Sequence, residues 1–125
     1  MDLSNIPLVR VTPEMKQKYI LVKVEVAEIE SEQEGKYILY GDFGARRHYN
    51  IFRFLDQCGL VVTDNKGGGK IQIIDTTKSV YLWDFSREFG RVDAGMAMQL
   101  LEQSHPGYTV FLNTPPPGHD PEEDQ

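Results

Sequence analysis

A histidine preceded by two arginines is the part of the sequence best suited to chemistry. The stretch GDFGARRHYNIFRFLDQCG, residues 41–59, places Arg46 and Arg47 directly before His48 and an apolar, helix-like run after it. Unpaired N–H groups and the positive end of the helix dipole attract anions to a helix start, where Arg47, His48 and Tyr49 each bring an N–H. A neutral imidazole there can activate water or attack phosphorus. The stretch indicates a phosphate site; the alternative is a solvated or capping histidine.

Two further segments contain residues that suit anion binding. The run KGGGK, residues 66–70, lacks the spaced first glycine and the Ser/Thr of a nucleotide-binding P-loop. It is predicted to be a flexible hairpin turn; alternatively, its glycines let the backbone approach a ligand closely. The run FSREFG, residues 85–90, is predicted to be a connecting loop, in which Ser86 and the N–H groups after it offer an anion nest.

Metal and thiol chemistry have little support in the sequence. His48, His105 and His119 do not have the spacing of metal ligands. The lone cysteine, Cys58, falls on the apolar face of a predicted helix and is expected to be part of the core. We therefore expect no metal and no cofactor.

The elements that position these residues follow from hydrophobic periodicity. Apolar residues at Ile51, Phe52, Leu55 and Cys58 predict a helix that begins near His48, and a second helix is predicted within residues 90–107. Strands are predicted at residues 18–30 with one face buried, and at 37–43, 59–64, 70–75, 79–85 and 108–112. The order β-β-α-β-β-β-α-β predicts an α+β fold, a mixed six-stranded sheet with two helices packed on it.

Length and charge limit the class of protein. The 125 residues suit one small domain, predicted at 16–113 after an N-terminal extension, 1–15. Residues 114–125 are rich in proline and acids and are predicted to form a disordered tail. The net charge is −6, and −2 without the four tail acids, which argues against a nucleic-acid binder. No apolar run is long enough to cross a bilayer, and no signal peptide is apparent, so we expect a cytoplasmic monomer without membrane contact.

Several segments, taken in order, resemble one family. They are KYILVKV in the first predicted strand, YGDFGARRHYNI with a glycine seven residues before the histidine, GGGK, and FSREFG. Across roughly residues 7–112 the chain resembles the 14 kDa protein histidine phosphatases and their relatives, the insect janus and ocnus proteins.

The resemblance implies a metal-independent enzyme that cleaves the P–N bond of phosphohistidine in a protein substrate. His48 would be the general base or nucleophile. The residues that would bind the phosphate, by side chain or by backbone N–H, are Lys18, Arg47, Tyr49, Lys70, Ser86 and Glu88. Arg46 and Arg87, which the resemblance does not assign, are further candidates because they bring positive charge to the same loops.

Differences from the phosphatases leave a second function open. The phosphatases usually carry an arginine where this chain has Tyr40, and Lys70 replaces an arginine, keeping the charge without the bidentate guanidinium. The alternative is a divergent janus/ocnus-type protein without catalysis, which binds phosphate or has a regulatory role of the sex-regulated, germ-line kind.

Overall fold

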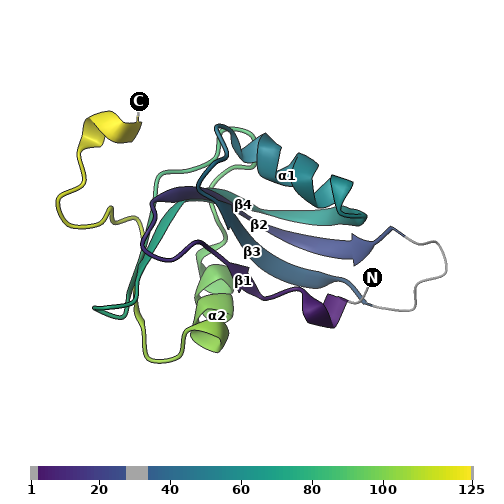
Figure 1. Ribbon diagram of the computed structural model, residues 1–125, viewed down its shortest axis with the longest axis horizontal. Helices are drawn as coiled ribbons and strands as arrows, with labels where there is room; N and C mark the ends of the chain where they lie inside the picture. Colours follow the sequence, from purple (N-terminus) through teal and green to yellow (C-terminus); the bar gives the residue numbers. More distant parts are fainter. Residues whose placement is uncertain (1–2, 28–33, 125) are drawn as a thin grey trace.

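One mixed sheet of six strands organises the chain (Figure 1). The structure, a computed structural model, describes residues 3–27 and 34–124. The strands are β1 (Val9–Arg10), β2 (Gln17–Val26), β3 (Lys36–Asp42), β4 (Leu60–Ile74), β5 (Ser79–Trp83) and β6 (Thr109–Phe111). Their order across the sheet is β1-β3-β2-β4-β5-β6; β1 with β3 and β5 with β6 are parallel, and the other pairs are antiparallel. The predicted α+β class with a six-stranded mixed sheet is confirmed. The order along the chain is β-β-β-α-β-β-α-β, because β1 lies in the predicted N-terminal extension and residues 60–74 form one strand.

The two α-helices cover opposite faces of this sheet (Figure 1). Helix α1 (His48–Gln57) buries Ile51 and Leu55 against one face. Helix α2 (Ala94–Ser104) buries Ala97, Leu100 and Leu101 against the other. Short 3-10 helices, η1 (Leu3–Asn5) and η2 (Pro121–Asp124), lie near the two ends of the chain.

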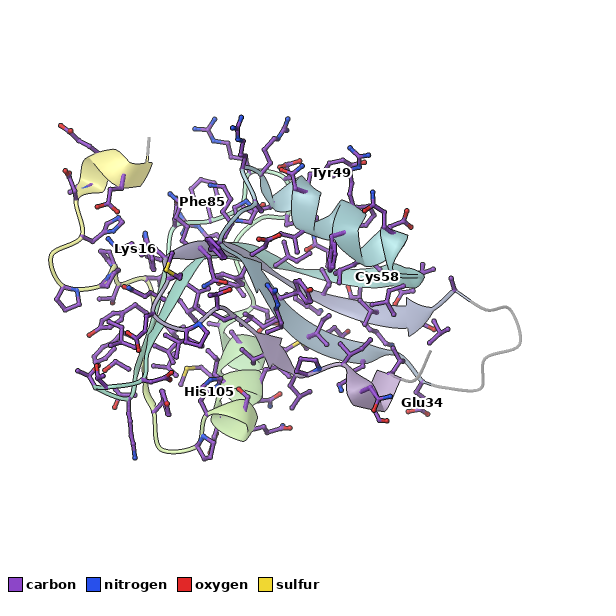
Figure 2. The ribbon with its side chains drawn as sticks, in the orientation of Figure 1. Lys16, Glu34, Tyr49, Cys58, Phe85 and His105 are labelled. Carbon is purple, nitrogen blue, oxygen red and sulfur yellow. The ribbon has the colours of Figure 1, made fainter. Side chains whose placement is uncertain are left out.

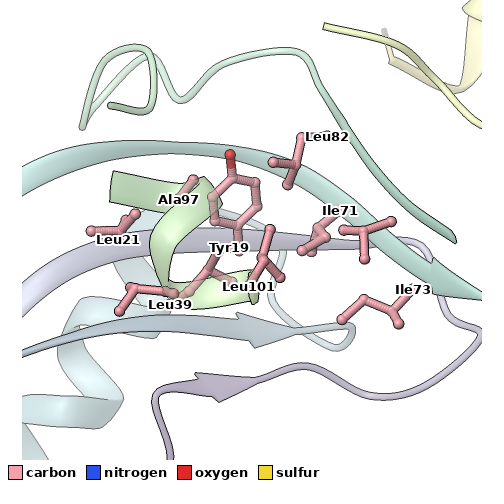
Figure 3. Close-up of a cluster of buried hydrophobic side chains, with 10 residues drawn as sticks. Tyr19, Leu21, Leu39, Ile71, Ile73, Leu82, Ala97 and Leu101 are labelled. Carbon is pink, nitrogen blue, oxygen red and sulfur yellow. The ribbon is translucent and has the colours of Figure 1, made fainter. Parts of the chain in front are cut away.

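Strand β2 is buried on both faces, which corrects the prediction of one buried face. Tyr19 and Leu21 pack in the cluster under α2, where Figure 3 shows them with Leu39 and Leu101. The alternate residues Ile20, Val22 and Val24 belong to the cluster under α1 and are fully buried as well. A strand between two helical layers has no solvent face along most of its length.

The triple glycine lies inside a strand, so the turn predicted at residues 66–70 is wrong. β4 runs through it and pairs with β2 on one side and, in its second half, with β5 on the other. A Cβ on Gly68 would lie 2.4 Å from the carbonyl oxygen of Tyr19, and one on Gly67 would lie 2.0 Å from that of Arg91. The glycines are therefore required by close approach of the chain's own backbone.

Two predictions remain to be compared with the structure. They are the end of the strand predicted at 18–30 and the division of the chain into extension, domain and tail. The end of the strand predicted at 18–30 falls on residues 28–30, which lie outside the described residues. The division into extension, domain and tail remains a prediction. Residues 114–124 contact the domain: the N–H of Thr114 donates to Leu82 O at 2.9 Å, and Pro116 is buried.

Candidate functional site

The start of helix α1 faces the glycine-rich part of β4. Arg47 has an extended backbone, φ −136° and ψ 150°, and its N–H donates to Asn50 Oδ1 at 3.0 Å. The helix therefore begins at His48 with one N–H already satisfied by its own first turn. At the other end Gly59 takes φ +84°, a left-handed conformation suited to ending a helix.

His48 is buried, whereas the sequence suggested an exposed helix start. Its residue surface is 7 % exposed, and Nε2 lies 2.8 Å from the carbonyl oxygen of Gly69. A carbonyl only accepts hydrogen bonds, so Nε2 carries the proton and donates. In the neutral ring Nδ1 is then the unprotonated nitrogen. Through this hydrogen bond the imidazole connects the first turn of α1 to β4 and holds the helix start in place.

The surroundings of His48 favour its neutral form. Burial lowers the pKa of the imidazole below its ordinary value, and the positive charge of Lys18 acts in the same direction. The hydrogen bond to Gly69 and the carboxylates of Glu88 and Asp84 oppose this shift without reversing it. At neutral pH His48 is therefore uncharged.

A cavity of about 550 Å³ opens beside the start of α1. Its lining side chains are mostly charged and come from β2, β4, the start of α1 and the loop before it, the loop after β5 and the tail. They are Lys18, Arg46, Arg47, His48, Lys70, Asp84, Phe85, Arg87, Glu88 and Glu123. Lys18 and Lys70 are directly opposite each other in the β2–β4 ladder, on the face covered by α1. Two like charges in such a pair repel each other, which favours an anion close to both.

Carboxylates of the chain itself meet these cations. Asp84 Oδ2 lies 3.3 Å from Lys70 Nζ. Glu88 reaches the helix start, where Oε1 accepts a long hydrogen bond, 3.4 Å, from the N–H of Tyr49, and Oε2 lies 3.5 Å from a guanidinium nitrogen of Arg47. The Glu88 side chain therefore lies near the N–H groups of the helix start, where the sequence predicts an external anion. Figure 2 shows Tyr49 on α1 and Phe85, from the loop that carries Glu88, both on the upper side of the molecule.

The structure brings together seven of the nine predicted site residues. Lys18, Arg46, Arg47, His48, Lys70, Arg87 and Glu88 line the cavity. Tyr49 contributes its N–H, which Glu88 engages. Ser86 is 0 % exposed and is not among the lining residues; its Oγ accepts from the N–H of Phe89 at 2.9 Å. Its hydroxyl therefore stabilises the loop, while a role in binding remains a prediction.

Tyr40 lies outside the cavity lining. Its ring packs against Phe54, with centroids 5.9 Å apart, and the guanidinium of Arg10 lies 5.1 Å from its centroid. The tyrosine is accommodated by aromatic and cation–π contacts. At this position the chain has a packing residue in place of the arginine usual in the phosphatases.

Sequence reasoning missed three lining residues, Asp84, Phe85 and Glu123. Asp84 and Phe85 follow directly after β5, and Asp84 takes φ +62°, a turn conformation that gives only a weak signal in sequence. Glu123 comes from a tail predicted to be mobile, and no local pattern indicates that it returns to the domain.

Two kinds of feature are not found within the described residues. Residues 3–27 and 34–124 contain no group of three or more His, Cys, Asp or Glu arranged to hold a metal ion. No helix in this part of the chain has the length and apolar character needed to cross a membrane.

Comparisons with known proteins agree on one family. The model of the Janus/Ocnus family matches residues 3–109. The sex-regulated protein janus-A of Drosophila mauritiana is 27% identical over 115 residues, which cover 89% of this chain and 82% of the relative. The proteins of the same name from Drosophila yakuba and Drosophila melanogaster are 28% and 26% identical, over 86% and 89% of this chain and 79% and 82% of the relatives.

These relatives correct the main functional prediction. A phosphohistidine phosphatase with His48 as base or nucleophile is contradicted, because the matching family and the relatives are described as Janus/Ocnus and sex-regulated proteins. The comparisons support the alternative, a regulatory protein of janus/ocnus type. With a family model that covers residues 3–109, the chain belongs to the Janus/Ocnus family.

Proposed function

We propose that this protein is a non-catalytic regulatory module that binds a phosphate group at the start of α1. The observation that carries the proposal is the Glu88 carboxylate, which already accepts from the N–H of Tyr49 beside Arg47. A helix start that holds a carboxylate of the chain offers the donors and the charge that a phosphate needs.

The charge of the cavity supports an anionic ligand. Five cationic and three acidic side chains line it, and His48 is neutral, so a positive balance of two remains. Two of these five cations, Lys18 and Lys70, form a cross-strand pair whose ammonium groups lie on the side facing α1. A volume of about 550 Å³ lies within the range of sites for small ligands and leaves room for a phosphate with part of the group that carries it.

We assign His48 a structural role, in line with relatives that are described as sex-regulated proteins. His48 donates through Nε2 to Gly69, and its ring is largely buried between α1 and β4. These contacts suit a residue that fixes the helix start. We therefore assign phosphate binding to the cations and N–H groups around His48.

The test is a titration of the ¹⁵N-labelled protein with inorganic phosphate, followed by amide NMR shifts. We expect saturable shifts at residues 47–49 and 86–88, weakened by added salt because the pocket is open to solvent. Lys70→Gln is expected to weaken binding about three- to tenfold, as loss of a charge-assisted contact would. Lys78→Gln removes the same charge from a residue outside the cavity lining and should leave binding unchanged.

Two results would contradict the proposal. Shifts absent from both segments would exclude a phosphate site at the helix start. Turnover of a phosphoramidate by the purified protein, lost on mutation of the pocket, would contradict the non-catalytic part.

The name of the janus-A relatives adds one expectation: the amount of this protein should differ between the sexes of its source organism, as measured by immunoblot.

A further inference from the structure

The C-terminal segment, residues 119–124, reaches the site from the opposite end of the chain. Lys16 Nζ donates to Glu123 Oε2 at 2.9 Å and to His119 Nδ1 at 3.0 Å. The side chain of His119 is 3 % exposed, and its ring meets Trp83 edge to face, with centroids 5.1 Å apart. The segment is therefore attached by an aromatic contact and by hydrogen bonds to one lysine. Figure 2 shows Lys16 on the side of the domain nearest the tail.

This attachment lies directly beside the proposed phosphate pocket. A second cavity of about 200 Å³ is lined by Lys16, His119 and Trp83, among others. It shares Lys18, Lys70 and Glu123 with the lining of the larger cavity. The two cavities are thus adjacent, with Glu123 on the wall of both. Glu123 of the tail therefore lines the same two cavities as Lys18 and Lys70.

The contact with Lys16 keeps the Glu123 carboxylate negatively charged at the edge of the pocket. The hydrogen bond from Lys16 holds the pKa of its carboxyl below the usual value, so the group is charged at neutral pH. The carboxylate adds negative potential to a pocket whose cations would otherwise attract phosphate more strongly.

We propose that residues 119–124 act as an intramolecular competitor of the anion ligand at the α1 site. The inference rests on the proposed function and specifies its regulation. A tethered segment has an effective concentration in the millimolar range, so a weak contact suffices to keep it docked while a ligand of higher affinity displaces it. The natural ligand is then expected to be a phosphate-bearing or acidic segment of another protein, because Glu123 of this chain's own acidic tail already lines the cavity.

The experiment compares phosphate binding by the native chain, Glu123→Gln and Glu122→Gln. Both variants lose one negative charge from adjacent positions, but only Glu123 lines the cavities and contacts Lys16. Glu123→Gln is expected to bind inorganic phosphate about two- to fivefold more tightly than Glu122→Gln, the size expected for an exposed ion pair. The amides of residues 119–124 should shift in Glu123→Gln without phosphate, and in the native chain when phosphate is added.

The outcomes separate this inference from the proposed function. Equal phosphate affinity in the two variants, with tail amides that do not respond to phosphate, would overturn the competitor role. The phosphate site would stand in that case, provided that residues 47–49 and 86–88 still shift. Absence of phosphate binding in all three proteins would overturn both.

Discussion

Replacement of His48 by alanine is expected to destabilise the protein by about 2 to 4 kcal/mol. His48 is 7 % exposed as a residue, and its imidazole donates to Gly69 O at 2.8 Å. Without it a buried carbonyl loses a donor, which costs about 1 to 3 kcal/mol. Loss of the buried ring carbons adds about 1 kcal/mol.

The assay is equilibrium unfolding in urea, followed by circular dichroism. For a chain of this length each kcal/mol corresponds to about 3 to 5 °C in Tm, so a parallel thermal scan should show a fall of about 6 to 20 °C. His48→Gln retains an N–H donor and is expected to lose less than half as much stability. Arg46→Ala, at an exposed neighbouring position, should stay within about 0.5 kcal/mol of the native protein.

The pH dependence of stability gives an independent check on His48. Burial lowers its pKa below the ordinary value of 6.5. Below pH 6.5 the unfolded chain therefore binds a proton that the native state resists, so this contribution to stability rises with pH and is fully present above that value. The advantage of the native protein over His48→Gln should shrink as the pH is lowered from about 7.5 to about 5.

A loss below about 0.5 kcal/mol for His48→Ala would refute this reasoning, because a buried hydrogen-bonded ring cannot be removed at so small a cost. Equal losses for the alanine and glutamine variants would show that the hydrogen bond to Gly69 contributes little.

Two further predictions concern the same site. Glu88→Gln removes the carboxylate beside the N–H of Tyr49 and should raise phosphate affinity about two- to tenfold by isothermal titration, whereas Glu102→Gln, on α2, should not change it. Unchanged affinity in Glu88→Gln would show that Glu88 does not compete with the anion. Gly68→Ala would place a Cβ 2.4 Å from a backbone carbonyl and should cost more than about 2 kcal/mol in urea unfolding, whereas Gly95→Ala, whose Cβ would meet nothing nearer than 3.6 Å, should leave stability equal or higher.

The sequence predicted the fold class because most elements have strong periodicity. The helix of residues 48–57 and the strands on both sides of it carry apolar residues at regular spacing. The run of three glycines was misinterpreted because glycine signals a turn when only local sequence is considered. Glycine is needed at positions 67 and 68 because the backbone of Arg91 and of Tyr19 lies too close for a Cβ. Both of these residues are distant in sequence.

The cations of the site were predictable, whereas the acids that oppose them were not. Lys18, Lys70 and the arginines before His48 could be assigned from the resemblance and from the helix start. The contacts of Glu88 with Tyr49 and of Glu123 with Lys16 link residues 39 and 107 positions apart. Hydrophobic periodicity in the sequence does not indicate side-chain contacts between residues so far apart. The cytoplasmic location, the monomeric state and the lack of nucleic-acid binding remain predictions.

A crystal structure of the protein grown with tungstate, a heavy-atom analogue of phosphate, tests the central claim most directly. We expect the tungsten anomalous peak beside the start of α1, with an oxygen within hydrogen-bond distance of the Tyr49 N–H and with the Glu88 carboxylate displaced from it. An anion that binds only elsewhere on the surface, while Glu88 still accepts from Tyr49, would contradict the account.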